Sequence, residues 1–243
     1  MTEDFISDIK REIKEFYEKE YGSDLLFVIY YGSWVFGLNS DGSDLDIAAV
    51  CKKFNAKQLE ETILFVKSLH SKYGLKLDED IPYENKVVIN SDFALKAIKG
   101  KGFARDFGKV IVQPIVKTRE FLSSSNIAMR LFLNAIMTKN VFCGGDFEEF
   151  NKMREIALKE SVRLFFSAWN VRKISLGKFV DNLIEFDNRT GQYYLGFENY
   201  SVVRNYLRDT YSQVFNLFVR EGYLIKDGEE YIVGDGKWFK EIN

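Results

Sequence analysis

Two aspartates, Asp44 and Asp46, are the residues of this sequence best placed to do chemistry. They open residues 44–50, DLDIAAV, which alternate in polarity and then become apolar, as a half-buried strand does. Side chains two residues apart on a strand point to the same face, so the two carboxylates should converge. Converging carboxylates repel each other unless a cation neutralises them, and oxygen ligands of this kind suit magnesium. The alternative is a pair of solvated acids at a strand end.

A glycine-serine turn lies a short distance upstream of the aspartates. Gly32-Ser33 follows the apolar run of residues 25–31, LLFVIYY, and ten residues separate Ser33 from Asp44. Glycine lets the backbone approach a phosphate closely, free N–H groups at a helix start favour anions, and a serine hydroxyl adds a donor. Because magnesium readily takes phosphate oxygens as further ligands, the two motifs together predict a site for a nucleoside triphosphate.

The order of these features is specific in residue type, spacing and context. A strand, a Gly-Ser turn, a loop and an Asp-x-Asp on the next strand occupy residues 31–50, YGSWVFGLNSDGSDLDIAAV. This segment resembles the polymerase-beta-like nucleotidyltransferase superfamily, and at the level of pattern the resemblance covers residues 20–118. It implies that family's minimal mixed sheet.

The resemblance also implies roles for individual residues. Asp44 and Asp46 would be catalytic and would bind two magnesium ions, while Gly32 and Ser33 would hold the triphosphate. Ser43, at the end of the loop before the aspartates, is also expected to bind the nucleotide. ATP is the expected triphosphate.

Enzymes of that family need a third carboxylate on a neighbouring strand. Residues 77–81, LDEDI, offer one, and period two puts Asp78 and Asp80 on one face and Glu79 on the other. Asp78 is the first choice as catalytic residue and metal ligand, with Asp80 as the alternative ligand. Neither is flanked on both sides by apolar residues, which departs from the family pattern. The other interpretation is an acidic strand exit before Pro82.

Hydrophobic periodicity and turn residues predict the elements that position these groups. Asn55 and Gln58 have the spacing of a capping box, and Gly74 is suited to end the helix that follows. The prediction is a mixed sheet with flanking helices. Its elements are a helix from Phe5 to near Gly22, strands over residues 25–31 and 44–50, a helix over residues 55–74, strands over residues 75–80 and 86–90, a helix over residues 92–99 and a strand over residues 110–116.

After residue 118 the period becomes helical. Helices are expected over residues 125–139, 146–174 and 201–220, and Asp227-Gly228 lies between two strand-like runs as in a β-hairpin. The fold class is therefore α+β, with a nucleotidyltransferase domain over residues 1–118 and a helical C-terminal domain over residues 119–243 that ends in a hairpin. The hairpin either only packs on the domain or completes a DNA-binding winged helix.

Composition narrows the classes of function. The formal net charge of −2 lacks the basic excess usual for nucleic-acid binding, so no nucleic-acid partner is expected. The two cysteines are isolated, and no apolar signal or membrane segment is present, so we expect a cytoplasmic protein with free thiols. The single histidine, His70, excludes a paired-histidine zinc site and is expected to be structural or solvated.

These observations lead to one expected function and three alternatives. The chain is expected to be a small-molecule nucleotidyltransferase similar to antibiotic-modifying enzymes, moving a nucleoside monophosphate from a triphosphate to a hydroxyl with two magnesium ions. One alternative is a toxin-like nucleotidyltransferase that acts on protein or tRNA. The others are a non-catalytic regulator that binds a nucleotide and one that binds DNA.

Overall fold

The computed structural model describes residues 3–39, 43–77, 87–98, 132–133, 135–168, 171–190 and 200–234. The chain divides into two compact units. Along the described part of the chain, Arg154 is the last residue of the first unit, and Glu155 begins the main part of the second unit. The domain boundary expected from the sequence is at residue 118, but residues 119–154 cluster with residues 1–97 in the first unit.

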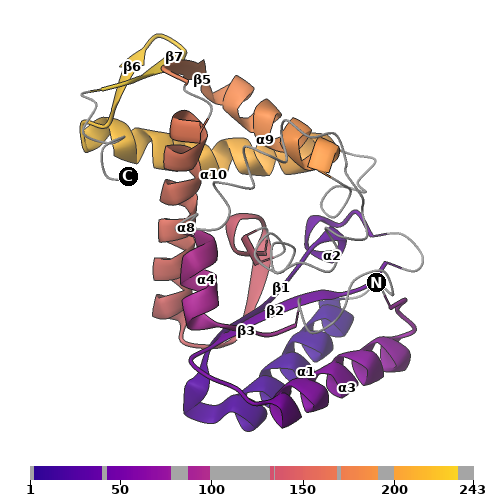
Figure 1. Cartoon of the computed structure of the whole chain (residues 1–243). Coiled ribbons are helices and arrows are strands. Elements are labelled where there is room, and N and C mark those ends of the chain that lie inside the picture. Colours follow the sequence, from indigo (N-terminus) through magenta and orange to yellow (C-terminus); the bar gives the residue numbers. More distant parts are fainter. Residues whose placement is uncertain are drawn as a thin grey trace. The chain divides into compact units, whose positions relative to one another are not determined.

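The first unit is built around a four-stranded mixed sheet flanked by helices (Figure 1). The strand order is β3-β2-β1-β4, with β1 antiparallel to both β2 and β4 and with β3 parallel to β2. This α+β arrangement agrees with the expected fold class. The elements are α1 (Glu3–Tyr21), the short 3-10 helix η1 (Gly22–Asp24), β1 (Leu25–Tyr31), α2 (Ser33–Phe36), β2 (Asp46–Cys51), α3 (Ala56–Tyr73), β3 (Ile89–Asn90), α4 (Ser91–Ile98), β4 (Asn140–Gly145) and the start of α8 (Phe147–Ala168).

Local sequence accounts for the two long helices of this unit. In α1 the buried side chains recur every four residues and so form one apolar face, at Ile9, Ile13, Tyr17 and Tyr21. The capping box at the start of α3 is present, with Gln58 N–H donating to Asn55 Oδ1 at 3.0 Å and Asn55 N–H to Gln58 Oε1 at 3.1 Å. Gly74 ends α3 with a φ of 65°. These predictions are confirmed.

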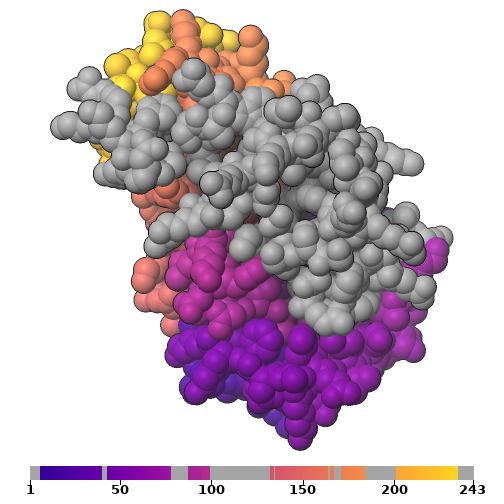
Figure 2. All heavy atoms as spheres, in the orientation of Figure 1, coloured from indigo at the N-terminus to yellow at the C-terminus, as the bar shows by residue number. Residues whose placement is uncertain are grey.

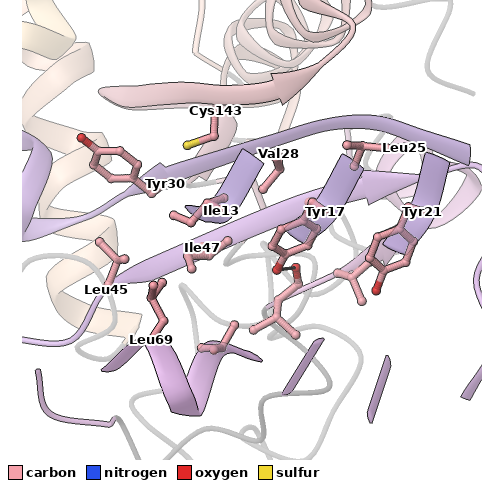
Figure 3. Packing of buried hydrophobic residues seen from close by; sticks show 14 of the residues in the cluster. Ile13, Tyr17, Tyr21, Leu25, Val28, Tyr30, Leu45, Ile47, Leu69 and Cys143 are labelled. Atoms are coloured by element: carbon pink, nitrogen blue, oxygen red, sulfur yellow. Dashed lines mark hydrogen bonds between the residues drawn. The ribbon is translucent and has the colours of Figure 1, made fainter. Parts of the chain in front are cut away.

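Helices α1 and α3 lie side by side on one face of the sheet (Figure 1). Figure 3 shows Ile13, Tyr17 and Tyr21 of α1 pointing at the strands, with side chains such as Val28 and Ile47 beside them. The buried Tyr17 hydroxyl donates to the Val87 carbonyl at 3.0 Å and so ties the helix to the segment before β3. In Figure 2 the purple atoms, which belong to the first unit, form a continuous surface.

Several expected strands differ from the observed ones. Strand β2 begins at Asp46 rather than at residue 44, and residues 75–77 are not in a strand. The strand expected over residues 86–90 is shortened to β3, Ile89–Asn90. Residues 110–116 lie outside the described part of the chain.

Strand β4 (Asn140–Gly145) was not predicted from the sequence. Its Gly144-Gly145 pair is typical of a turn, yet here Gly145 has a φ of 90° and lies against the backbone of Leu26 and Phe27 in β1. A register shift between Val28 and Ile29 marks the irregular pairing of the two strands. A glycine inside a strand commonly marks such close backbone approach.

The second unit combines helices with a three-stranded antiparallel sheet of order β5-β7-β6. The hairpin at Asp227-Gly228 is confirmed. The helix expected over residues 146–174 ends at Ala168, and Ile174 belongs to a strand. The elements are the later part of α8, β5 (Lys173–Ser175), α9 (Leu176–Thr190), α10 (Tyr200–Arg220), β6 (Leu224–Asp227) and β7 (Glu230–Val233).

Both cysteines are buried free thiols in the first sheet. Burial raises the pKa of Cys51 and that of Cys143 to about 12 each, so both thiols stay protonated near neutral pH. Neither is suited to act as a nucleophile. Among the described residues, no helix is long and apolar enough to cross a membrane.

Candidate active site

Gly32 and Asp46 lie next to each other, at the place where β1 ends and β2 begins. Tyr31, the last residue of β1, pairs with Asp46, so the chain turns at Gly32 directly beside that carboxylate. Gly32 has φ 85° and ψ −155°, a combination open essentially only to glycine. A Cβ added at Gly32 would collide with Oδ2 of Asp46 and would lie 3.3 Å from its Cγ. The structure thus brings one predicted phosphate-binding residue against one predicted metal ligand.

Asp46, the first residue of β2, faces away from the core that α1 and α3 cover. Ile47, beside it in the strand, is 1% exposed and belongs to that core, and Leu45, just before the strand, is 3% exposed and belongs to it as well. Because side chains alternate along a strand, the half-buried Asp46 lies on the opposite face of the sheet from Ile47. Asp44, which precedes the strand, is also half-buried.

The turn after β1 is held by its own backbone. Val35 N–H donates to the Gly32 carbonyl at 3.2 Å, and Leu38 N–H donates to the Ser33 carbonyl at 2.9 Å. Gly37 closes α2 with a φ of 69°. Ser33 is half-buried at the start of this turn.

Ser43 is also half-buried and directly precedes Asp44. The other residues of the predicted site lie outside the described part of the chain. These are the third-carboxylate candidates Asp78 and Asp80.

Lys139 is a neighbour of the turn that sequence analysis missed. Its Nζ lies 5.9 Å from the centroid of the Phe36 ring in α2. The segment that carries it is fixed, because Arg154 Nη1 donates to the Thr138 carbonyl at 2.8 Å and Asn140 Nδ2 to the same carbonyl at 3.1 Å. A lysine held here can contribute positive charge near a phosphate. Its position depends on the pairing of β4 with β1, for which the sequence offers no local signal.

His70 is buried behind the aspartates and bonds to the peptide between them. It is 1% exposed, its Nδ1 lies 2.8 Å from the Val66 carbonyl, and Leu45 N–H donates to its Nε2 at 3.0 Å. Because a carbonyl only accepts, Nδ1 must carry the proton and Nε2 must be the acceptor. Leu45 precedes β2, so without His70 its buried N–H would lose this partner. His70 thus fixes the backbone that carries Asp44 and Asp46.

Replacing His70 by leucine is expected to lower the free energy of unfolding by about 2 kcal/mol, because the Leu45 N–H loses its acceptor in a buried place. It should also weaken magnesium-dependent nucleotide binding, because the aspartates are displaced. Chemical denaturation and nucleotide titration measure the two effects. His70→Gln, which can keep an acceptor oxygen near the Nε2 position, should retain more of both.

Thr62→Val is the matched control for His70→Leu. Thr62 lies in the same helix and forms a buried hydrogen bond with the Tyr21 hydroxyl of α1 at 2.5 Å, which does not involve the segment that carries the aspartates. Its loss should lower stability without changing nucleotide binding. If His70→Leu behaves in the same way as Thr62→Val, His70 has no role in positioning the site.

The described residues fit part of a magnesium site. Asp44 and Asp46 are half-buried carboxylates that provide oxygen donors, and Asp46 lies beside the backbone of Gly32, which provides the close approach that a phosphate needs. Within the described ranges, no cluster of three or more His, Cys, Asp or Glu side chains could hold a metal ion. The sequence matches no protein family and no curated protein. The site is therefore interpreted from its own geometry.

Proposed function

We propose that the chain is a nucleotidyltransferase of the polymerase-beta-like kind, which transfers a nucleoside monophosphate from a nucleoside triphosphate to a hydroxyl group. The observation that carries the proposal is the contact between Gly32 and Asp46 at the junction of β1 and β2. It joins a backbone that can approach a phosphate to a carboxylate that can hold a cation. The proposed acceptor is a small molecule, in keeping with the net charge of −2.

In this proposal Asp44 and Asp46 hold magnesium, with Asp78, or Asp80 in its place, as the third carboxylate. Bound magnesium supplies charge neutralisation at the phosphates. The Gly32-Ser33 backbone and the Ser33 hydroxyl bind the triphosphate, and Ser43 is the third proposed nucleotide-binding residue. ATP is the expected nucleotide.

The reaction is an in-line substitution at the α-phosphorus. The acceptor oxygen forms a bond to this atom while the bond to the bridging oxygen of the β-phosphate breaks, so pyrophosphate leaves. The acceptor proton passes to a carboxylate of the site. The protein contributes mainly by positioning the two oxygens and by stabilising the negative charge.

Product analysis tests this proposal. The protein is incubated with magnesium, each of the four triphosphates and a panel of hydroxylated small molecules, including aminoglycosides and lincosamides. The expected result is pyrophosphate release together with an acceptor whose mass increases by one nucleoside monophosphate, and neither with Asp46→Asn. Release of inorganic phosphate would instead indicate a hydrolase, and an acceptor whose mass increases by one phosphoryl group, with release of the nucleoside diphosphate, would indicate a kinase. Transfer only to added tRNA or protein would indicate the toxin-like class.

A further inference from the structure

Three strand ends meet at the candidate site, and β4 supplies the third of them. Tyr31, at the end of β1, pairs with Asp46 of β2 on one side and with Asn140 of β4 on the other. Asp46 and Asn140 are the first residues of their strands. Because neighbouring strands lie about 4.8 Å apart, the start of β4 is about 10 Å from the start of β2. Gly32, which follows Tyr31, therefore leaves the sheet between these two strands.

Lys139 directly precedes β4 at this edge of the sheet. Its side chain is exposed, and its Nζ lies 5.9 Å from the centroid of the Phe36 ring. Phe36 is the last residue of α2, and Ser33 is the first. Lys139 thus reaches the turn that follows β1 from the β4 side, whereas Asp46 lies beside the start of that turn from the β2 side.

Hydrogen bonds fix the backbone on both sides of Lys139. Arg154 Nη1 donates to the Ile136 carbonyl at 2.9 Å and to the Thr138 carbonyl at 2.8 Å. Asn140 Nδ2 donates to the same Thr138 carbonyl at 3.1 Å. Only the side chain of Lys139 must therefore be ordered when an anion binds, which keeps the entropic cost of binding small.

The contact with Phe36 leaves Lys139 able to bind an anion. A cation–π contact at an exposed site is weak, whereas a hydrogen bond from an ammonium group to a phosphate is charge-assisted. The Phe36 side chain is buried, while Lys139 is exposed and carries three N–H donors. A phosphate can therefore replace the ring as the partner of the ammonium group.

The two sides of the turn differ in charge, and this difference would orient a bound triphosphate. Asp44 and Asp46 are acidic and belong to the side where the proposed transfer takes place, whereas Lys139 is basic and lies across β1 from them. The β- and γ-phosphates carry most of the negative charge of a triphosphate, so the lysine side favours them. A positive charge at that place would also stabilise the pyrophosphate that leaves.

We propose that Lys139 binds the β- and γ-phosphates and makes the site select nucleoside triphosphates over monophosphates. This inference rests on the proposed nucleotidyltransferase function and deepens it. It assigns a specificity-determining role to a residue that precedes β4, on the side of β1 away from the aspartates.

Displacement of labelled ATP from the full-length protein, with magnesium present, tests this inference. Lys139→Ala should weaken the binding of ATP and of inorganic pyrophosphate by about tenfold or more, because a hydrogen bond between charged groups is lost. AMP, which lacks both outer phosphates, should have the same inhibition constant with the variant as with the wild type. Lys139→Arg keeps the charge and should bind ATP within about threefold of the wild type.

Lys53→Ala is the matched control for Lys139→Ala. Lys53 lies beyond the opposite end of β2, its side chain is 80% exposed, and its Nζ lies 4.0 Å from Asp24 Oδ2. Removal of this charge should leave the affinity for ATP within about twofold of the wild type.

The result that overturns this inference differs from the one that overturns the proposed function. If the wild type binds no nucleoside triphosphate with magnesium, the proposed function is wrong and the role of Lys139 is wrong with it. If the wild type binds ATP and Lys139→Ala binds it equally well, only the role of Lys139 is wrong. An equal loss in Lys53→Ala, or an equal loss for AMP, would also overturn that role, because the effect would then be one of net charge or of folding.

Discussion

Gly32→Ala is expected to abolish magnesium-dependent nucleotide binding. The φ of 85° and ψ of −155° at Gly32 are strained for alanine, at a cost of about 2 kcal/mol of stability. The added methyl group would also meet the carboxylate of Asp46, which must move to make room. Nucleotide binding is lost for two reasons: the methyl group blocks the approach of a phosphate to the Gly32 backbone, and it displaces Asp46, a proposed metal ligand. Isothermal titration with each triphosphate and a denaturation curve check the two parts.

Gly74→Ala is the control for this substitution. Gly74 has a φ of 65°, but a Cβ there meets no atom within 4 Å. The left-handed backbone alone should cost about 1 kcal/mol, with nucleotide binding unchanged. The interpretation of the site is wrong if Gly32→Ala is destabilised to the expected extent and still binds nucleotide like the wild type.

Gly145→Ala is expected to have the larger effect on stability. A Cβ on this residue would lie 2.5 Å from the Leu26 carbonyl oxygen and 2.7 Å from Phe27 Cα. Both are backbone atoms of β1, so strands β1 and β4 must separate locally. That movement also strains the 2.7 Å hydrogen bond from Asp146 N–H to the Leu26 carbonyl. Together with the φ of 90°, the overpacking should lower the free energy of unfolding by about 3 kcal/mol.

Gly22→Ala isolates the backbone contribution to the Gly145 result. Gly22 has a φ of 50° and no atom within 4 Å of an added Cβ, so about 1 kcal/mol is expected. Urea denaturation of the two variants measures the difference. Equal losses would mean that β4 does not approach β1 as closely as described.

Local patterns made much of the first unit predictable. The apolar spacing of α1, the Asn55–Gln58 capping box and the run of β1 each depend on residues close in sequence. The hairpin at Asp227-Gly228 was predictable for the same reason. Such features are encoded by the chain's own backbone preferences and need no distant partner.

Features that depend on distant contacts were not predictable. Strand β4 exists because it pairs with β1, more than a hundred residues earlier, and its two glycines suggested a turn. Residue composition did not suggest that the His70 ring would accept from the Leu45 amide, because the two are separated along the chain and meet only when α3 packs on the sheet. Lys139 reaches α2 for the same non-local reason.

The candidate site contains both a feature that the sequence predicts and one that the structure does not test. The approach of Gly32 to Asp46 follows from the order of strand, turn and strand, which the sequence displays. The third carboxylate is different, because Asp78 and Asp80 lie outside the described part of the chain, so their role stays a prediction.

The most direct test of the central claim is calorimetric titration of ATP, GTP, CTP and UTP, with and without magnesium, into wild type and into Asp44→Asn combined with Asp46→Asn. Asp8→Asn in α1 serves as a control for removal of an acid. The account predicts that at least one triphosphate binds only with magnesium, that the double variant loses this binding while remaining folded, and that the control keeps it. Absence of binding by every triphosphate, or binding that the double variant retains, would contradict it.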